Sequence, residues 1–195
     1  VIIYATTRPL NNPDRYMYVQ AMGIGLGVVC FFIASALDLR RFPRLWIVFF
    51  IFNILFQLSL YFLGEAGDTG NKSWIPVGPI NVQPGEVGKI IFIFTLASHM
   101  NQLKEKLNHP GSILQLAAHM GITTVAVFAI SDDMGVALTY PVIFLFMLFA
   151  GGVSLWWLLA GVRAMGLVAW PLWLMMCEHQ QYRLLVVFDP VISPP

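Results

Sequence analysis

Apolar runs of about 20 residues recur along almost the whole chain, and they restrict its fold more than any other feature. A helix needs about 20 mostly apolar residues to cross a bilayer, whereas a membrane strand needs only about 9–11. We therefore predict an all-α fold, a polytopic transmembrane helical bundle. About six spans are expected, at roughly residues 16–37, 44–64, 84–102, 112–131, 134–153 and 155–177.

The two ends of the chain look like cut ends of a longer sequence. The first residues, "VIIYATT", are too short to span and have the character of the end of one more span. The last residues, "DPVISPP", resemble a turn rather than a finished element. We therefore expect residues 1–195 to be a fragment of one larger membrane domain.

Composition supports the membrane assignment and excludes several other classes. The chain is 58% hydrophobic and 11% charged, whereas soluble domains carry about 25% charged residues. A net charge of +1 argues against a nucleic-acid partner held by bulk electrostatics. The two cysteines, Cys30 and Cys177, belong to apolar runs and form no CxxC pair, so neither a disulfide framework nor a zinc site is predicted.

The distribution of basic residues predicts the orientation of the chain in the membrane. Two connections on one side hold Arg40, Arg41 and Arg44, and Lys104 and Lys106. By the positive-inside rule these two loops are cytoplasmic. The opposite side carries only scattered basic residues, namely Arg8, Arg15, Lys72 and Arg183.

The longest connection between two spans, residues 65–83, is predicted to be an outer loop. It is rich in Gly, Pro and Asn, which is typical of loops. Trp74 within it is either a residue of the aromatic belt at the membrane interface or part of a site at the loop.

The stretch "NVQPGEVGKIIFIF", residues 81–94, places two ionisable side chains at the start of an apolar run. Pro84 suits the first turn of a helix, and Glu86 in that turn is favoured by the helix dipole. Lys89 follows three residues later, so the two can form an ion pair on one face. The pair is either a capped helix start at the interface, with a snorkelling lysine, or a paired charge that faces a cavity inside the bundle.

Two further polar groups lie between or within the predicted spans. Asp132 and Asp133 form either a solvated turn with an N-cap for the next helix or a carboxylate that lines an outward cavity. His119 and Gln115 lie one turn apart inside a span, where an interhelical hydrogen bond is expected. The histidine spacing does not match a metal site.

Three motifs, in order along the chain, resemble the FtsW/RodA/SpoVE family, the SEDS proteins of bacterial division and elongation. "KSWIPVGPINVQPGEVGK" (72–89) is similar to the family's W-I, turn and Q-P-S-E stretch with a lysine three residues after the Glu. Gly85 stands where the family has Ser, and Asn81 where some members have Arg. The matching residues are Trp74, Gln83, Pro84, Glu86 and Lys89.

The other two motifs are less specific. "ISDDMGVALTYPVIFLFMLFAGG" (130–152) looks like the family's Q-P-D-L-G-T-A-L stretch, with Ser131 and Asp132 in place of Gln-Pro. "QQYRLLVVFDP" (180–190) looks like the family's Q-x-x-R…L-D-P segment. The matching residues are Asp133 and Gly135 in the first motif and Arg183, Asp189 and Pro190 in the second.

The resemblance implies a multi-pass enzyme of about ten spans in the bacterial plasma membrane. Such proteins polymerise lipid II into peptidoglycan glycan strands during cell division or elongation, usually with a class B penicillin-binding protein. The family's proposed catalytic aspartate would lie in an outer loop beyond Pro195, so no catalytic residue is expected in this chain and its own activity stays open. No bound cofactor is expected, and a divalent cation is an option for the whole enzyme, because the diphosphate leaving group needs positive charge or a metal.

The resemblance also suggests roles for the matching residues. Lys89 would line the lipid-substrate cavity or meet phosphate, and Glu86 would position Lys89. Trp74 would line the entry and Asp133 would anchor the outer loop. Two other functions stay open: a non-catalytic membrane protein that binds a partner in the division or elongation machinery, and a lipid II transporter or flippase.

Overall fold

The computed structural model describes residues 13–36, 45–65, 73–77, 80–175 and 181. Within these residues most of the chain is helical, with one short antiparallel hairpin. The elements, in chain order, are α2 (Pro13–Ala36), α3 (Trp46–Leu58), α4 (Leu60–Leu63), β1 (Ile75–Val77), β2 (Ile80–Val82), α5 (Pro84–Gln102), the 3-10 turn η2 (Lys104–Lys106), α6 (Pro110–Ser131), α7 (Met134–Ala150) and α8 (Leu155–Met175).

Each apolar run predicted as a span forms a helix in nearly the predicted place. By length and composition alone, two helical stretches are long and apolar enough to cross a membrane, Trp46–Leu63 and Pro110–Ser131. Shorter apolar helices cover Met17–Val29, Met134–Ala150 and Leu155–Leu167. The helical character is therefore confirmed, while the number of helices that cross the membrane stays a prediction.

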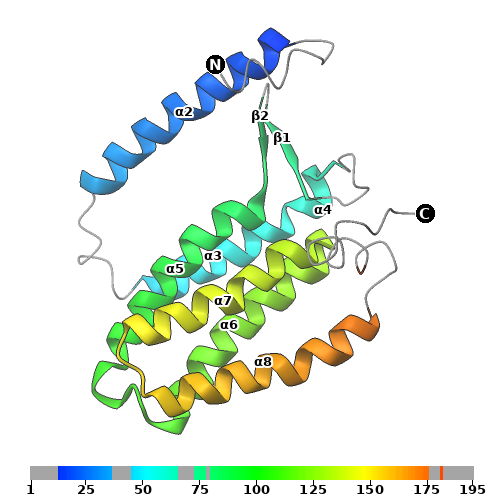
Figure 1. The fold of residues 1–195 in the computed structure, drawn as a ribbon. Helices are drawn as coiled ribbons and strands as arrows, with labels where there is room; N and C mark the ends of the chain where they lie inside the picture. The colour runs from blue at the N-terminus through cyan, green and yellow to red at the C-terminus, as the bar shows by residue number, and fades with distance from the viewer. Residues whose placement is uncertain (1–12, 37–44, 66–72, 78–79, 176–180, 182–195) are drawn as a thin grey trace.

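Four helices form the central bundle, in which α5 packs against α3, α6 and α7. Figure 1 shows α8 along the outside of this bundle and α2 apart from it. α8 packs against α7. The outer faces of α2, α3 and α8 carry many exposed aliphatic and aromatic side chains. An apolar exterior of this kind suits a hydrocarbon solvent.

The interior of the bundle combines apolar packing with polar side chains. Its apolar core lies between α5, α6 and α7 and includes Phe92, Leu96, Leu116, Val127 and Tyr140, each fully buried. Buried polar side chains also lie between the helices, because in an apolar solvent interhelical hydrogen bonds contribute to association. They include Asn53, Gln57, Thr95, His119 and Thr123.

The mostly helical structure departs from the expected all-α fold in one place, the second half of residues 65–83, where a short hairpin forms. Strands β1 and β2 pair antiparallel, with Pro76 opposite Asn81. The β-branched residues Ile and Val at both ends of each strand favour this hairpin, and a two-stranded ribbon tolerates proline because both strands are edges. The hairpin leads directly into α5 and thereby positions its first turn (Figure 1).

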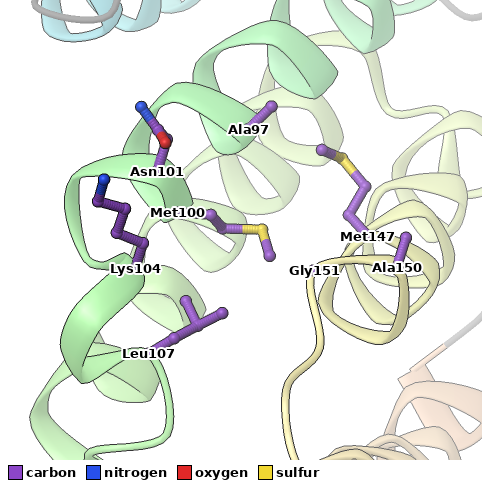
Figure 2. Close-up of a pocket in the computed structure, with 8 residues that line it drawn as sticks. All are labelled: Ala97, Met100, Asn101, Lys104, Leu107, Met147, Ala150 and Gly151. Atoms are coloured by element: carbon purple, nitrogen blue, oxygen red, sulfur yellow. The ribbon is translucent and has the colours of Figure 1, made fainter.

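A pocket of about 400 Å³ opens between the ends of α5 and α7 that lie farthest from the hairpin. Figure 2 shows its lining, which comes from the last turns of α5, from η2 and the residue after it, and from the last turns of α7. The two helices thus leave a space between them at this end.

Candidate functional site

The candidate site begins at the start of α5, where an acidic and a basic side chain form an ion pair. Gln83 is the N-cap, in an extended conformation, and Pro84 occupies the first turn, where its missing N–H costs no hydrogen bond. Lys89 Nζ lies 2.7 Å from both carboxylate oxygens of Glu86. The predicted ion pair is therefore confirmed. The Lys89 side chain is mostly buried, with 20% exposed, whereas the Glu86 side chain is 52% exposed.

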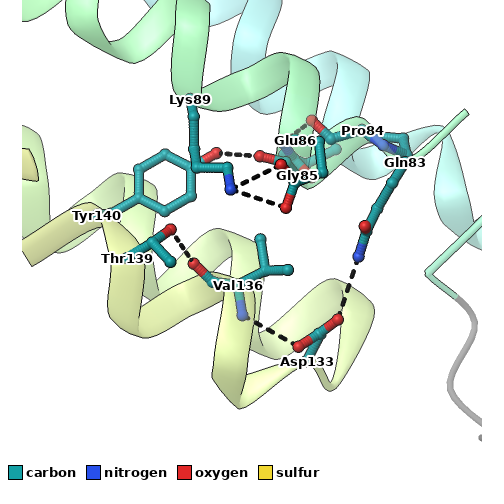
Figure 3. A network of polar contacts seen from close by, with 10 residues as sticks. Gln83, Pro84, Gly85, Glu86, Lys89, Asp133, Val136, Thr139 and Tyr140 are labelled. Atoms are coloured by element: carbon teal, nitrogen blue, oxygen red, sulfur yellow. Dashed lines mark hydrogen bonds and ion pairs between the residues drawn. The ribbon is translucent and has the colours of Figure 1, made fainter. Parts of the chain in front are cut away.

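A second polar contact joins the start of α5 to the start of α7. Asp133, the N-cap of α7, accepts a hydrogen bond from the backbone N–H of Val136 at 3.0 Å through Oδ1. Its Oδ2 accepts from Gln83 Nε2 at 3.1 Å. Figure 3 shows this contact beside the Glu86–Lys89 pair. The predicted N-cap is confirmed, and the same carboxylate also ties two helix starts together.

Three buried side chains that the sequence interpretation missed reach the first two turns of α5. Two come from α3 and one from α7, and each donates a hydrogen bond to a backbone carbonyl of α5. Such bonds supplement those within the helix and fix the position of its first turns against both neighbours. The pairs are Gln57 with Pro84 at 2.9 Å, Tyr140 with Gly85 at 2.9 Å and Asn53 with Gly88 at 3.3 Å.

Gly88 allows these side chains to approach the helix. A Cβ at this position would lie 2.5 Å from Gln57 Nε2, 2.7 Å from Tyr140 Oη and 2.8 Å from Asn53 Oδ1. A sequence signal for part of this arrangement existed, because Asn53 and Gln57 are one helical turn apart in an otherwise apolar run. Tyr140 gave no comparable signal, since it lies among aromatic and aliphatic residues.

Two departures from the resembled family pattern meet in space. Gly85 stands where the pattern has Ser, and Val136 where it has Thr. A Cβ at Gly85 would lie 2.7 Å from Val136 Cγ1. The valine methyl therefore occupies the space that a side chain at position 85 would need, and the two departures form one contact between α5 and α7.

A third departure lies at the junction of α6 and α7. Asp132, which replaces the pattern's proline, caps the C-terminus of α6 with φ of 51°. Proline cannot adopt this left-handed conformation, because its ring holds φ near about −65°, whereas Asp tolerates it. The preceding carbonyl, of Ser131, accepts a hydrogen bond from Ser73 Oγ at 3.1 Å, which attaches the segment before β1 to this junction.

The remaining residues of the predicted site are not part of this network or lie outside the described residues. Trp74 is 38% exposed, and its carbonyl accepts a backbone hydrogen bond from Glu65 at 2.9 Å. Arg183 and Asp189 belong to residues 182–195, which the structure does not describe. Figure 3 shows Gln83, Pro84, Glu86, Lys89 and Asp133 close together, whereas the backbone of Trp74 pairs with Glu65.

The site holds one cation, Lys89, and two carboxylates, those of Glu86 and Asp133. Lys89 carries three donor hydrogens, and two of them can be directed at Glu86. The third stays available to an acceptor that approaches from the exposed side. Among the described residues, no group of three or more His, Cys, Asp or Glu side chains could hold a metal ion.

A separate polar cluster joins α5 and α6 deeper in the bundle and confirms the interhelical hydrogen bond expected of His119. His119 Nε2 lies 3.2 Å from Thr95 Oγ1, and His119 Nδ1 lies 3.2 Å from His99 Nδ1. Trp46 stacks on His99, with ring centroids 4.1 Å apart. Thr95 Oγ1 donates to the Phe92 carbonyl at 3.1 Å, and this arrangement is compatible with a hydrogen bond that it accepts from His119.

Comparisons with known proteins agree on one family. A sequence model described as cell cycle protein, for FtsW, RodA and SpoVE, matches residues 2–194. The chain is 27% identical over 187 residues to a probable peptidoglycan glycosyltransferase FtsW from Alkalilimnicola ehrlichii, covering 94% of this chain and 46% of that protein. The chain thus spans about half the length of the curated relatives it matches.

Solved structures show a similar fold. One, described as structural coordination of polymerization and crosslinking by a peptidoglycan synthase complex, aligns with a TM-score of 0.67 and 25% identity, covering 99% of this chain and 58% of that chain. The Thermus thermophilus rod shape determining protein RodA aligns with a TM-score of 0.59 and 23% identity, covering 77% of this chain and 49% of that chain.

Proposed function

Because this chain belongs to the FtsW/RodA/SpoVE family of cell cycle proteins, we propose that it takes part in polymerising lipid II into peptidoglycan glycan strands. Family membership and the apolar helices together support a multi-pass membrane protein. The observation that carries the proposal is the Glu86–Lys89 pair, held at the start of α5 within the most specific of the family motifs. A lipid with a diphosphate group is a fitting ligand for a partly exposed lysine.

In this proposal Lys89 meets the phosphate of the lipid substrate, and Glu86 holds the lysine in place. The hydrogen bond between Gln83 and Asp133 keeps the starts of α5 and α7 at a fixed distance, and so fixes the position of Lys89 relative to α7. A carboxylate that removes a proton from the attacking sugar hydroxyl is also required. Both candidate carboxylates here already have partners, which is consistent with a base located elsewhere in the whole protein.

The proposal includes a membrane orientation and a partner. The start of α5 and the hairpin would face outward, and the Lys104–Lys106 and Arg40–Arg44 loops would face the cytoplasm. The partner would be a class B penicillin-binding protein, which crosslinks the strands. The similarity to a chain of a peptidoglycan synthase complex supports this pairing.

The experiment measures glycan polymer formed from labelled lipid II by the full-length protein in liposomes. Lys89→Ala should lower the yield about tenfold or more, the loss that corresponds to one charge-assisted hydrogen bond of about 1.5–3 kcal/mol. Lys106→Ala is the matched control, because Lys106 is an exposed lysine in η2, far from this site. It should leave the yield unchanged.

Each alternative gives a different result in the same assay. Equal yields from Lys89→Ala and wild type, both correctly inserted, would refute the role of the lysine. Polymer from neither protein, together with retention of a penicillin-binding protein, would favour a binding function without catalysis. Transfer of labelled lipid II across the bilayer without polymer would favour a transporter.

A further inference from the structure

The pocket between the far ends of α5 and α7 has one polar edge and an apolar interior. Met100, Leu107 and Met147 point into it, and Met100 and Leu107 are almost fully buried. Asn101 and Lys104 also line it, and Figure 2 shows both on the α5 and η2 side of the opening. A cation and an amide donor thus border a cavity whose walls are formed by sulfur and aliphatic side chains.

The position of this pocket along the helix suits the membrane interface. Lys104 is the first residue of η2, directly after α5 ends at Gln102 and Leu103. Lysine at a helix end extends its ammonium toward the headgroup region while its methylene chain lies against apolar surface. The pocket therefore has its charged edge at headgroup level and its apolar walls toward the hydrocarbon.

We propose that this pocket binds an anionic phospholipid. Its phosphate accepts hydrogen bonds from Lys104 Nζ and the Asn101 amide, and part of one acyl chain lies against Met100, Leu107 and Met147. Basic pockets between transmembrane helices bind anionic headgroups in this way. A volume of about 400 Å³ lies within the range of small-ligand sites, about 300–1,000 Å³. The site is at the opposite end of α5 from the Glu86–Lys89 pair, so the proposal does not depend on the polymerase function.

The test titrates the purified full chain in detergent with lipids and counts bound lipids by native mass spectrometry. Phosphatidylglycerol is compared with phosphatidylcholine of the same acyl chains and with glycerol phosphate, which has the headgroup chemistry without the chains. Lys104→Gln should weaken phosphatidylglycerol binding about fivefold, the factor that corresponds to about 1 kcal/mol for one lysine near an anionic surface. Lys106→Gln removes the same charge two residues away, outside the pocket lining, and should leave binding unchanged.

A third variant probes the apolar part of the pocket. Ala97 is exposed and lines the opening, so Ala97→Leu adds volume there without removing a contact of the core. This substitution should weaken the binding of both phosphatidylglycerol and phosphatidylcholine. Circular dichroism and thermal unfolding are used to check that all variants are folded. If Lys104→Gln and Lys106→Gln weaken phosphatidylglycerol binding equally, the proposal is overturned, and the lipid is attracted by the general positive charge of this surface. Effective competition by glycerol phosphate would overturn it in favour of a phosphate site, and unchanged binding by Ala97→Leu would exclude an acyl chain.

Discussion

Gly88 is the position at which one methyl group tests the packing of the candidate site. The Cβ of Gly88→Ala would lie 2.5–2.8 Å from polar atoms of three side chains, those of Gln57, Tyr140 and Asn53. Each contacting atom is at the end of a side chain, so one side chain alone could move away. All three side chains surround the same Cβ, so relief requires that all three move. Each side chain also donates a hydrogen bond to α5, so relief of the contact lengthens or breaks these bonds.

The expected loss of stability follows from these contacts. Interhelical hydrogen bonds in membrane proteins contribute about 0.6 kcal/mol each on average, so loss of all three removes about 2 kcal/mol. Inserting a methyl group into a packed interior costs a further amount of about 1–3 kcal/mol. Alanine recovers about 1 kcal/mol relative to glycine in a helix. We therefore expect Gly88→Ala to lower the free energy of unfolding by about 3 kcal/mol.

The assay is unfolding of the purified protein by increasing SDS in mixed micelles, followed by circular dichroism. Gly121→Ala is the matched control, because Gly121 is also a helical glycine and a Cβ there would have no neighbour within 4 Å. It should be neutral or stabilise by up to about 1 kcal/mol. If both variants unfold at the same SDS fraction, the close approach of three side chains to Gly88 does not constrain this fold.

Two further predictions follow from contacts between helices. Gly85→Ser should destabilise the protein by about 1–2 kcal/mol, because its Cβ would press against Val136. The same substitution in a Val136→Ala background should cost about 1 kcal/mol less, and additive losses in the same SDS titration would contradict this coupling. His119→Phe should cost about 1–3 kcal/mol, because His99 loses a buried hydrogen-bond partner. Thr95→Val should cost less, since its hydroxyl also bonds within its own helix, and thermal unfolding would distinguish the two.

Local features of the sequence predicted most of the helical structure. Pro84 and Glu86 indicated the start of α5, and the helix begins at Pro84. Asp133 was recognised as a candidate N-cap, and its carboxylate accepts from the N–H of Val136. These interactions join residues within one helical turn, so a local reading of residue types is enough to find them.

The hairpin shows where a local interpretation was misleading. Gly, Pro and Asn predicted a loop throughout residues 65–83, yet Ile75–Val77 and Ile80–Val82 pair as strands. Strands this short carry a weak pattern, because three residues give only one full alternation of the side-chain direction. The hairpin is stabilised by the pairing of its two strands and by the hydrogen bonds of Ser73 and Glu65. The residue pattern of each strand alone did not indicate it.

The sequence by itself determined an apolar helical membrane protein, the starts of α5 and α7 and the Glu86–Lys89 pair, because hydrophobic length, helix capping and i,i+3 spacing act over short stretches of chain. Only the tertiary structure decided that Gln83 reaches Asp133, and that Gln57 and Tyr140 donate to carbonyls of α5. Those contacts join residues between 27 and 55 positions apart. They depend on how closely α3, α5 and α7 approach, and that distance is set by side-chain packing around small residues such as Gly85 and Gly88.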